Sequence, residues 1–174
     1  MSCREGFVPK PNAFLSLKYP DALYHNIALN LPFKFDKNKL AIVQVIQNKG
    51  NSKSLNLNYP LLKANLYLSY HPLDENLSRY VSETEFTTKN HAKVAHEVTE
   101  QKFENFRTNV FGKMYELTGP VASQCQFYVT DSSQHFLTGS LYFKVKPNYD
   151  SILPAVRYVH KDMIRLVESL EWKF

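Results

Sequence analysis

The chain has 174 residues, of which 44% are hydrophobic and 21% are charged, as is typical of one globular domain of ordinary size. No stretch approaches the roughly 18 apolar residues that a membrane-spanning helix needs, so a membrane-bound form would have to be held by a lipid. The formal net charge is +5, but acidic and basic residues are interspersed. Nucleic-acid-binding proteins usually gather positive charge on one face, so we expect no nucleic-acid partner.

The first residues have the features of a lipid-anchored tether. Cys3 follows a small residue, Ser2, which is the arrangement at which a bacterial lipoprotein is acylated after its signal peptide is removed. We interpret Met1 as standing in place of such a removed leader; the alternative from the residues alone is an incidental terminal thiol. One acyl chain anchors weakly, whereas a triacylated cysteine would supply a stable anchor. Glycine and prolines in 1–13 break regular structure, so we expect a flexible tether ahead of a single α+β domain at 14–174.

The first half of this domain alternates between apolar and polar residues, as half-buried strands do. Strands are predicted over 14–19, 40–47, 55–59 and 63–70, and a weaker pattern indicates a short strand at 27–31.

A helix is predicted after these strands. Asp74 suits an N-cap, and apolar residues at helical spacing continue to about residue 101. The middle of this segment, 82–90, is polar and β-branched, which favours a break there.

The second half has the clearest pattern. Three alternating runs at 111–117, 123–131 and 135–145 are separated by short turns, and they predict an antiparallel meander. After a turn at 147–150, apolar residues at 3.6-residue spacing predict an amphipathic C-terminal helix. This stripe consists of Ile152, Val156, Val159, Met163, Leu166 and Leu170.

Together these elements predict an α+β fold. We expect a twisted antiparallel sheet of about six strands, with the C-terminal helix on one face and the mid-chain helix covering another part.

The residues most like a catalytic constellation lie at a predicted hairpin tip: Asp131, Ser132, Ser133 and His135. A triad requires serine, histidine and acid to converge beside an oxyanion hole, and no G-x-S-x-G nucleophile elbow is present. We therefore expect the acid and the serines to satisfy the backbone of the turn. An esterase that uses Ser132 or Ser133 with His135 is the enzymatic alternative.

Metal and cofactor motifs are also missing from the sequence. His91 and His96 are five residues apart, which splays them across a helix, and neither cysteine has a partner at zinc-ligand spacing. Cys125 lies in an alternating strand, as a small buried hydrophobe would. No glycine-rich phosphate loop is present. We predict no enzyme activity, no catalytic residue, no metal site and no cofactor.

Aromatic residues are plentiful, with 12 Phe, 11 Tyr and one Trp, and most of them follow strand alternation and are predicted to be core residues. Trp172 stands just beyond the last helix, where it either clamps the C-terminus onto the domain or contributes to a contact patch. The candidate partner-binding residues are Tyr128, Asp131, His135, Tyr149 and Trp172.

Several short motifs carry a family resemblance. They are QFYVTDS at 126–132, HFL at 135–137, GSLYF at 139–143, PN at 147–148 with DS at 150–151, and LEWK at 170–173, together with Cys3 and PKP at 9–11. With these motifs the chain resembles the gliding-motility lipoprotein GldD family of Bacteroidetes over essentially its whole length, most strongly over 111–173.

The resemblance implies an outer-envelope lipoprotein that is required for gliding and is associated with the type IX secretion machinery. It implies no enzyme activity and no cofactor, and the one functional position that it transfers is Cys3, as the lipid attachment site. No acidic run of the kind that resembles a surface-export signal follows Cys3. We therefore expect the periplasmic face of the outer membrane rather than the cell surface. The order of elements also resembles the PsbP/Mog1-like fold of non-catalytic, partner-binding domains.

We therefore expect a non-catalytic binding or scaffold component of the cell envelope. Its partners would be envelope proteins of the motility and secretion apparatus, and a lipid at Cys3 would hold it to the membrane. The alternative is a small-ligand or lipid-binding module with an aromatic-lined cleft between the sheet and the helices.

Overall fold

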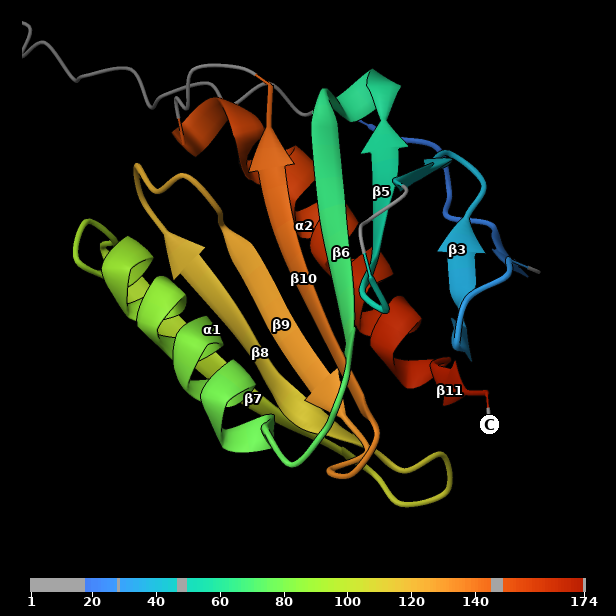
Figure 1. The fold of residues 1–174 in the computed structure, drawn as a ribbon. Coiled ribbons are helices and arrows are strands. Elements are labelled where there is room, and N and C mark those ends of the chain that lie inside the picture. The colour runs from blue at the N-terminus through green and yellow to red at the C-terminus, as the bar shows by residue number, and fades with distance from the viewer. Residues whose placement is uncertain (1–17, 28, 47–49, 145–148, 174) are drawn as a thin grey trace, which may run out of the picture.

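The structure is a computed structural model that describes residues 18–27, 29–46, 50–144 and 149–173. Its centre is a seven-stranded antiparallel sheet with the strand order β4-β5-β6-β10-β9-β8-β7 (Figure 1). The strands of this sheet are β4 (Ile42–Ile46), β5 (Lys53–Tyr59), β6 (Ala64–Pro72), β7 (Glu97–Asn105), β8 (Val110–Thr118), β9 (Cys125–Thr130) and β10 (His135–Phe143). The predicted α+β class and the meander of β8, β9 and β10 are confirmed.

Short elements complete the fold beside this sheet. β1 (Tyr24–Asn26) pairs with β3 (Asp36–Asn38), and β2 (Phe33–Lys34) pairs with β11 (Glu171–Trp172). A 3₁₀ turn, η1 (Pro60–Leu62), joins β5 to β6. The second pairing joins the C-terminal end of the domain to its N-terminal part.

The larger core lies between the sheet and α2 (Tyr149–Glu168), which crosses one face of the sheet (Figure 1). All six residues of the predicted apolar stripe are buried, as its 3.6-residue spacing requires. They pack against the inward-facing strand residues, which include Leu55, Leu57, Leu66, Leu68, Leu137 and Leu141. The core between helix and sheet combines these aliphatic side chains with aromatic ones such as Tyr59 and Phe127.

The opposite face of the sheet carries α1 (Leu77–Ala92), which contacts β8, β9 and β10. A smaller cluster lies beneath this helix, with Tyr115, Leu117, Val121, Tyr128 and Phe136 buried at its centre. Figure 1 shows α1 in front of one half of the sheet, and no helix of the described residues lies in front of β5 and β6.

Gly139 explains how β9 and β10 pack so closely. A Cβ at this position would lie 2.1 Å from the ring of Phe127, the residue paired with it on β9. The glycine therefore makes room for a large aromatic ring in the core.

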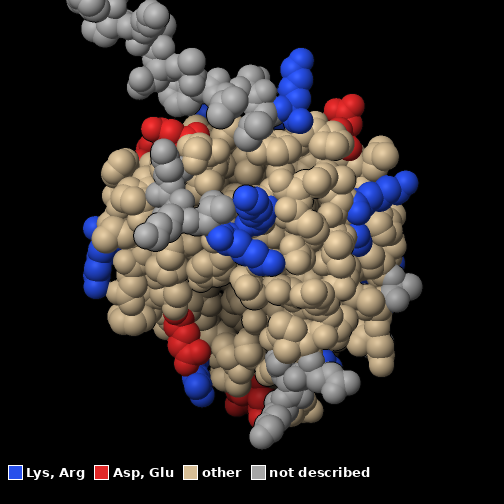
Figure 2. Space-filling view, turned by 90° about the horizontal axis from the view of Figure 1, so that it is seen from above, with Lys and Arg blue, Asp and Glu red and all other residues tan. Residues whose placement is uncertain are grey.

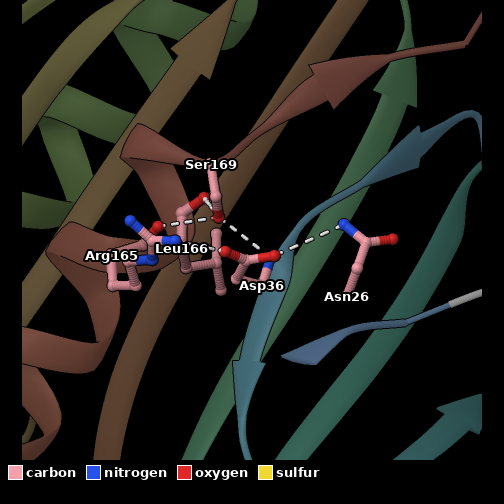
Figure 3. A network of polar contacts seen from close by, with 5 residues as sticks. All are labelled: Asn26, Asp36, Arg165, Leu166 and Ser169. Atoms are coloured by element: carbon pink, nitrogen blue, oxygen red, sulfur yellow. Dashed lines mark hydrogen bonds and ion pairs between the residues drawn. The ribbon is translucent and has the colours of Figure 1, made fainter. Parts of the chain in front are cut away.

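A polar network fastens β3 to the C-terminal end of α2 (Figure 3). Arg165 Nη2 donates to Asp36 Oδ2 at 2.5 Å, and the backbone N–H of Asp36 donates to Ser169 Oγ at 2.8 Å. The Ser169 hydroxyl donates in turn to the Arg165 carbonyl at 2.8 Å, and Asn26 adds a 3.4 Å contact to Asp36 Oδ1. These bonds hold the β1–β3 pair against the helix.

A buried carboxylate strengthens the same contact. Asp162 of α2 accepts hydrogen bonds from the Tyr24 hydroxyl at 2.6 Å and from the Asn38 amide at 2.9 Å. Burial raises the pKa of Asp162, although these donors act in the opposite direction.

One prediction was wrong: the mid-chain helix does not reach residue 101. It ends at Ala92, and the segment assigned to its second half forms the edge strand β7. This strand is exposed at nearly every position, so it lacks the apolar alternation by which the other strands are recognised. With β7 the sheet has seven strands, where about six were expected.

Smaller differences concern the N-terminal part. The helix is capped by Asn76 rather than by Asp74, without a side-chain hydrogen bond from the cap. The short strand expected at 27–31 lies instead at Tyr24–Asn26. Most of the strand expected at 14–19, and all of the tether 1–13 with Cys3, lie outside the described residues.

Candidate functional site

The turn between β9 and β10 holds the constellation that the sequence singled out. Asp131 Oδ1 accepts backbone hydrogen bonds from Ser133, Gln134 and His135 at 3.0, 2.8 and 2.8 Å. Burial acts to raise the pKa of the Asp131 carboxyl, but these N–H donors outweigh it and hold the pKa below its usual value. The carboxylate therefore organises the turn, as expected.

The side chain of His135 lies in the core rather than at the turn surface. Its Nδ1 is 2.9 Å from the Tyr70 hydroxyl, and its ring stacks on Trp172 with centroids 4.9 Å apart. Trp172 Nε1 donates to the Asn109 carbonyl at 3.0 Å, so this tryptophan clamps the C-terminus onto the domain. Burial lowers the pKa of His135, with Asp131 acting in the opposite direction, and this favours the neutral imidazole.

These contacts do not assemble an esterase. Ser132 and Ser133 are exposed at the tip of the turn, and the Ser133 hydroxyl donates to Asp131 Oδ2 at 3.2 Å. The imidazole of His135 contacts Tyr70 instead. In these contacts the imidazole of His135 lies against core residues, and the two serines lie at the exposed tip of the turn.

The other two candidate partner-binding residues lie elsewhere. Tyr128 is buried beneath α1, where it stacks on Phe136 with ring centroids 5.7 Å apart. Tyr149 begins α2 and is half-buried, and burial raises its pKa. The five candidates thus do not form one surface: Tyr128, His135 and Trp172 are buried, and partner binding through Asp131 or Tyr149 stays a prediction.

Histidine and cysteine residues are the remaining candidates for a metal or thiol site. His91 Nδ1 lies 2.6 Å from Gln126 Nε2, which ties α1 to β9. Among the described residues, no group of three or more His, Cys, Asp or Glu side chains is placed to hold a metal ion. Cys125 is a buried free thiol, as predicted, and burial raises its pKa.

A small apolar hollow lies between the sheet and α2. It has a volume of about 50 Å³, and Phe103, Met114, Phe127 and Ile164 are among its lining residues. Ligand pockets typically have roughly 300–1,000 Å³. This hollow is too small for a drug-sized ligand. A second hollow of about 270 Å³ lies between α1 and the sheet, with Phe103, Phe111 and Tyr128 in its wall, so the aromatic-lined cleft stays a prediction.

Sequence reasoning missed the edge strand β4 as a functional feature. Its five residues, Ile-Val-Gln-Val-Ile, carry no charge, and Ile42, Val45 and Ile46 are 54%, 52% and 44% exposed. An edge strand presents unpaired N–H and C=O groups that can pair with another chain. The signal was available in the sequence as an uncharged β-branched run.

The other edge, β7, has the opposite character. Four of its nine residues are charged, namely Glu97, Glu100, Lys102 and Glu104. Glu100 also forms an ion pair with Lys113 of β8 at 3.0 Å. Charged side chains of this kind protect an edge from pairing, so among the described residues β4 is the edge of the seven-stranded sheet that lacks this protection.

Charge is dispersed on the part of the surface that is visible from above. Figure 2 shows a small central group of basic side chains and otherwise scattered charged side chains on a largely uncharged face. The described residues on this face therefore form no basic stripe of the kind that nucleic-acid binders present.

Neither α1 nor α2 combines the length and apolar character needed to cross a membrane. The fold and this surface define an α+β domain with one protected and one unprotected sheet edge.

The chain belongs to the gliding motility lipoprotein GldD family, because the model of that family matches residues 4–172. Membership indicates a lipid-anchored envelope component with a role in gliding motility. No curated protein and no solved structure matches the chain.

Proposed function

We propose that the protein is a non-catalytic scaffold of the gliding apparatus and of the associated type IX secretion machinery. A lipid on Cys3 anchors it to the periplasmic face of the outer membrane, and residues 1–13 act as the tether. The anchor confines the domain to two dimensions, which raises its effective concentration near envelope partners. Family membership supports the motility role.

The mechanism that we propose is strand addition at β4. A partner protein lays an extended segment beside Ile42–Ile46 and pairs with its outer backbone groups. The observation that carries this proposal is the absence of charge from the exposed β4 edge, because the other edge of the same sheet, β7, is charged. Exposed Val45 and Ile46 would give the partner apolar contacts.

A matched pair of lysine substitutions tests the proposal. Val45→Lys places a charge on the β4 edge, and Val98→Lys places the same charge on β7, where the native valine is 42% exposed. Burying an unpaired charge in a strand-pairing interface costs a few kcal/mol, so partner recovery with Val45→Lys should fall roughly tenfold or more.

The readouts are colony spreading and recovery of crosslinked envelope partners from cells that carry only the variant. Immunoblots must show equal amounts of both variants in the membrane fraction. The proposal predicts that Val45→Lys cells lose spreading and that Val98→Lys cells keep it. Normal spreading of Val45→Lys cells would contradict docking at β4.

A further inference from the structure

The sheet face that α1 leaves open is lined by uncharged polar side chains. Strand alternation places these residues opposite the apolar core that faces α2. The inner three strands contribute Ser54, Asn56, Asn58, Asn65, Tyr67, Ser69, Thr138, Ser140 and Tyr142, and β4 adds Ile42, Gln44 and Ile46 at the border. None of these twelve residues is Asp, Glu, Lys or Arg. We call this set the open face.

The lack of charge is unusual for an exposed sheet surface. Lys, Glu, Arg and Asp are mostly exposed residues in folded proteins, and β7 of the same sheet follows that rule. The open face instead has amides, hydroxyls and two tyrosines; Tyr67 is 41% exposed, Asn65 is buried, and the other members on β5, β6 and β10 are partly exposed. The choice of side chains therefore points to a ligand rather than to solvation alone.

The two tyrosines form the aromatic part of the open face. Tyr67 of β6 and Tyr142 of β10 have ring centroids 5.6 Å apart and lie at 74° to each other. Paired in this way, the rings offer both an edge and a flat surface. A ligand with apolar C–H groups between its polar groups can pack on such rings.

The amide of Asn56 lies at the centre of the open face, paired with Gln44 on one side and with Tyr67 on the other. Its Oδ1 has no hydrogen-bond partner in the described structure. A polar atom without a partner costs about 1–3 kcal/mol when it is shielded from water. The Asn56 amide thus presents an acceptor that is shielded from solvent and that no described group satisfies.

A hollow of about 390 Å³ lies at the end of β10, between Tyr142 of the open face and Phe143 and Ile152 on the α2 side of the sheet. The β8–β9 loop contributes Pro120, Ala122 and Gln124 to its wall. Gln124 is 1% exposed and donates through Nε2 to the Val121 carbonyl, whereas its Oε1 has no partner in the described structure. A second amide oxygen is therefore left unpaired at this end.

These features exclude several ligand classes for this surface. An anionic ligand such as a nucleic acid or an acidic lipid would require Lys or Arg, and a divalent cation would require carboxylates. A lipid surface would require a continuous apolar patch. A chain of neutral sugars matches instead, because its hydroxyls both donate and accept hydrogen bonds and its ring C–H groups pack on tyrosine.

We propose that the open face binds an uncharged glycan strand of N-acetylated amino sugars, as found in the bacterial cell wall. The acetamido groups of such a chain would pair with the asparagine amides, which a plain glucan could not do. Four strands spaced about 4.8 Å apart, each with three residues on this face, give a platform of about 14 by 14 Å, which holds a few sugar rings. The assignment of the ligand to the cell wall rests on the proposed envelope location. The preference for a neutral amino-sugar chain rests on the chemistry of the open face alone.

The test is titration of the isolated domain with a tetramer of N-acetylglucosamine, followed by two-dimensional NMR. A glucose tetramer and a sulfated polysaccharide serve as comparators. We expect shifts confined to the open face, binding of the amino-sugar tetramer at least tenfold tighter than that of the glucose tetramer, and no loss of binding with added salt. Sedimentation of the domain with purified peptidoglycan sacculi should give the same ranking of variants.

Three variants make the test specific. Tyr67→Ala should weaken binding about tenfold, since the loss of one ring contact of about 1.4 kcal/mol corresponds to that factor. Tyr67→Phe keeps the ring and should bind nearly as the native chain does. Phe86→Ala removes a ring on α1 that is 67% exposed and should have no effect. The native NMR dispersion of each variant shows that it is folded.

Three outcomes would overturn the proposal. The first is no binding of either the amino-sugar tetramer or the sacculi, and the second is tighter binding of the sulfated polymer that salt abolishes. The third is concentration-dependent dimerisation that Tyr67→Ala removes, which would assign the face to a second copy of the chain. Val45 lies on the other side of β4, so Val45→Lys should keep sugar binding, and the failure of either proposal leaves the other standing.

Discussion

Two halves of one sheet face differ in what lies on them. Over β8 and β9, α1 covers the sheet, and the side chains beneath it are aromatic and aliphatic. Over β5 and β6 the described part of the chain places no helix, and the side chains in the same rows are amides, hydroxyls and a tyrosine. We call these regions the covered half and the open half.

The two halves differ in whether their aromatic side chains are used for packing or left exposed. Phe136 of the covered half is stacked between Tyr80 of α1 and Tyr128 of β9, with centroid distances of 5.4 and 5.7 Å. Tyr67 of the open half contacts Tyr142 and stays 41% exposed. The covered half therefore stabilises the fold, and the open half is available to a ligand.

The largest expected effect concerns the covered half. Phe136→Ala should lower the free energy of unfolding by about 3–5 kcal/mol, because it removes a fully buried ring from a stacked cluster. The matched change in the open half, Tyr67→Ala, should cost only about 1 kcal/mol, since one edge-to-face contact is lost. Urea unfolding of both variants measures the difference, and equal costs would contradict the division between the two halves.

A pH effect is expected at the boundary between the halves. His71 stacks on Tyr80 with centroids 4.7 Å apart, and its Nδ1 lies 3.0 Å from Ser52 Oγ. Burial lowers its pKa from 6.5, with Glu83 of α1 acting in the opposite direction. The unfolded chain then binds more protons just below pH 6.5, so stability is complete above that pH and falls as the pH drops.

The melting temperature at pH 7.5 and at pH 5.5 measures this effect. The native chain should melt lower at pH 5.5, and His71→Gln should reduce the difference. Some dependence should remain, because burial lowers the pKa of His135 in the same direction. A native chain that is more stable at pH 5.5 would contradict the burial of these two imidazoles in neutral form.

The smallest effect is expected from Asn56, at the centre of the open half. Asn56→Val removes the unpartnered amide oxygen and introduces a residue favoured in strands, so stability should rise by up to about 1 kcal/mol. Binding of the amino-sugar tetramer should fall at the same time. Thermal melts and NMR titration of the same sample test both, and a loss of stability would show that Asn56 serves the fold.

Much of the fold could be predicted because the apolar residues of its main helix and strands recur at regular spacing. The stripe of α2 and the meander of β8, β9 and β10 bury one face each, so their periodicity is visible in the sequence. β7 escaped prediction because an exposed edge strand has no apolar face, and its polar residues suit a helix equally well. The open half and the uncharged, unpaired β4 edge are decided by how distant segments pack, including which strands α1 covers. A local sequence pattern does not contain this information.

Photocrosslinking in cells tests the central claim most directly, namely that the uncharged β4 side of the sheet is where partners bind. A photoreactive residue is placed at position 45 or at position 98, both exposed edge positions, in the only copy of the protein in gliding cells. We expect a defined protein adduct from position 45 and none from position 98. Adducts from position 98 alone, or the same pattern from both positions, would contradict it.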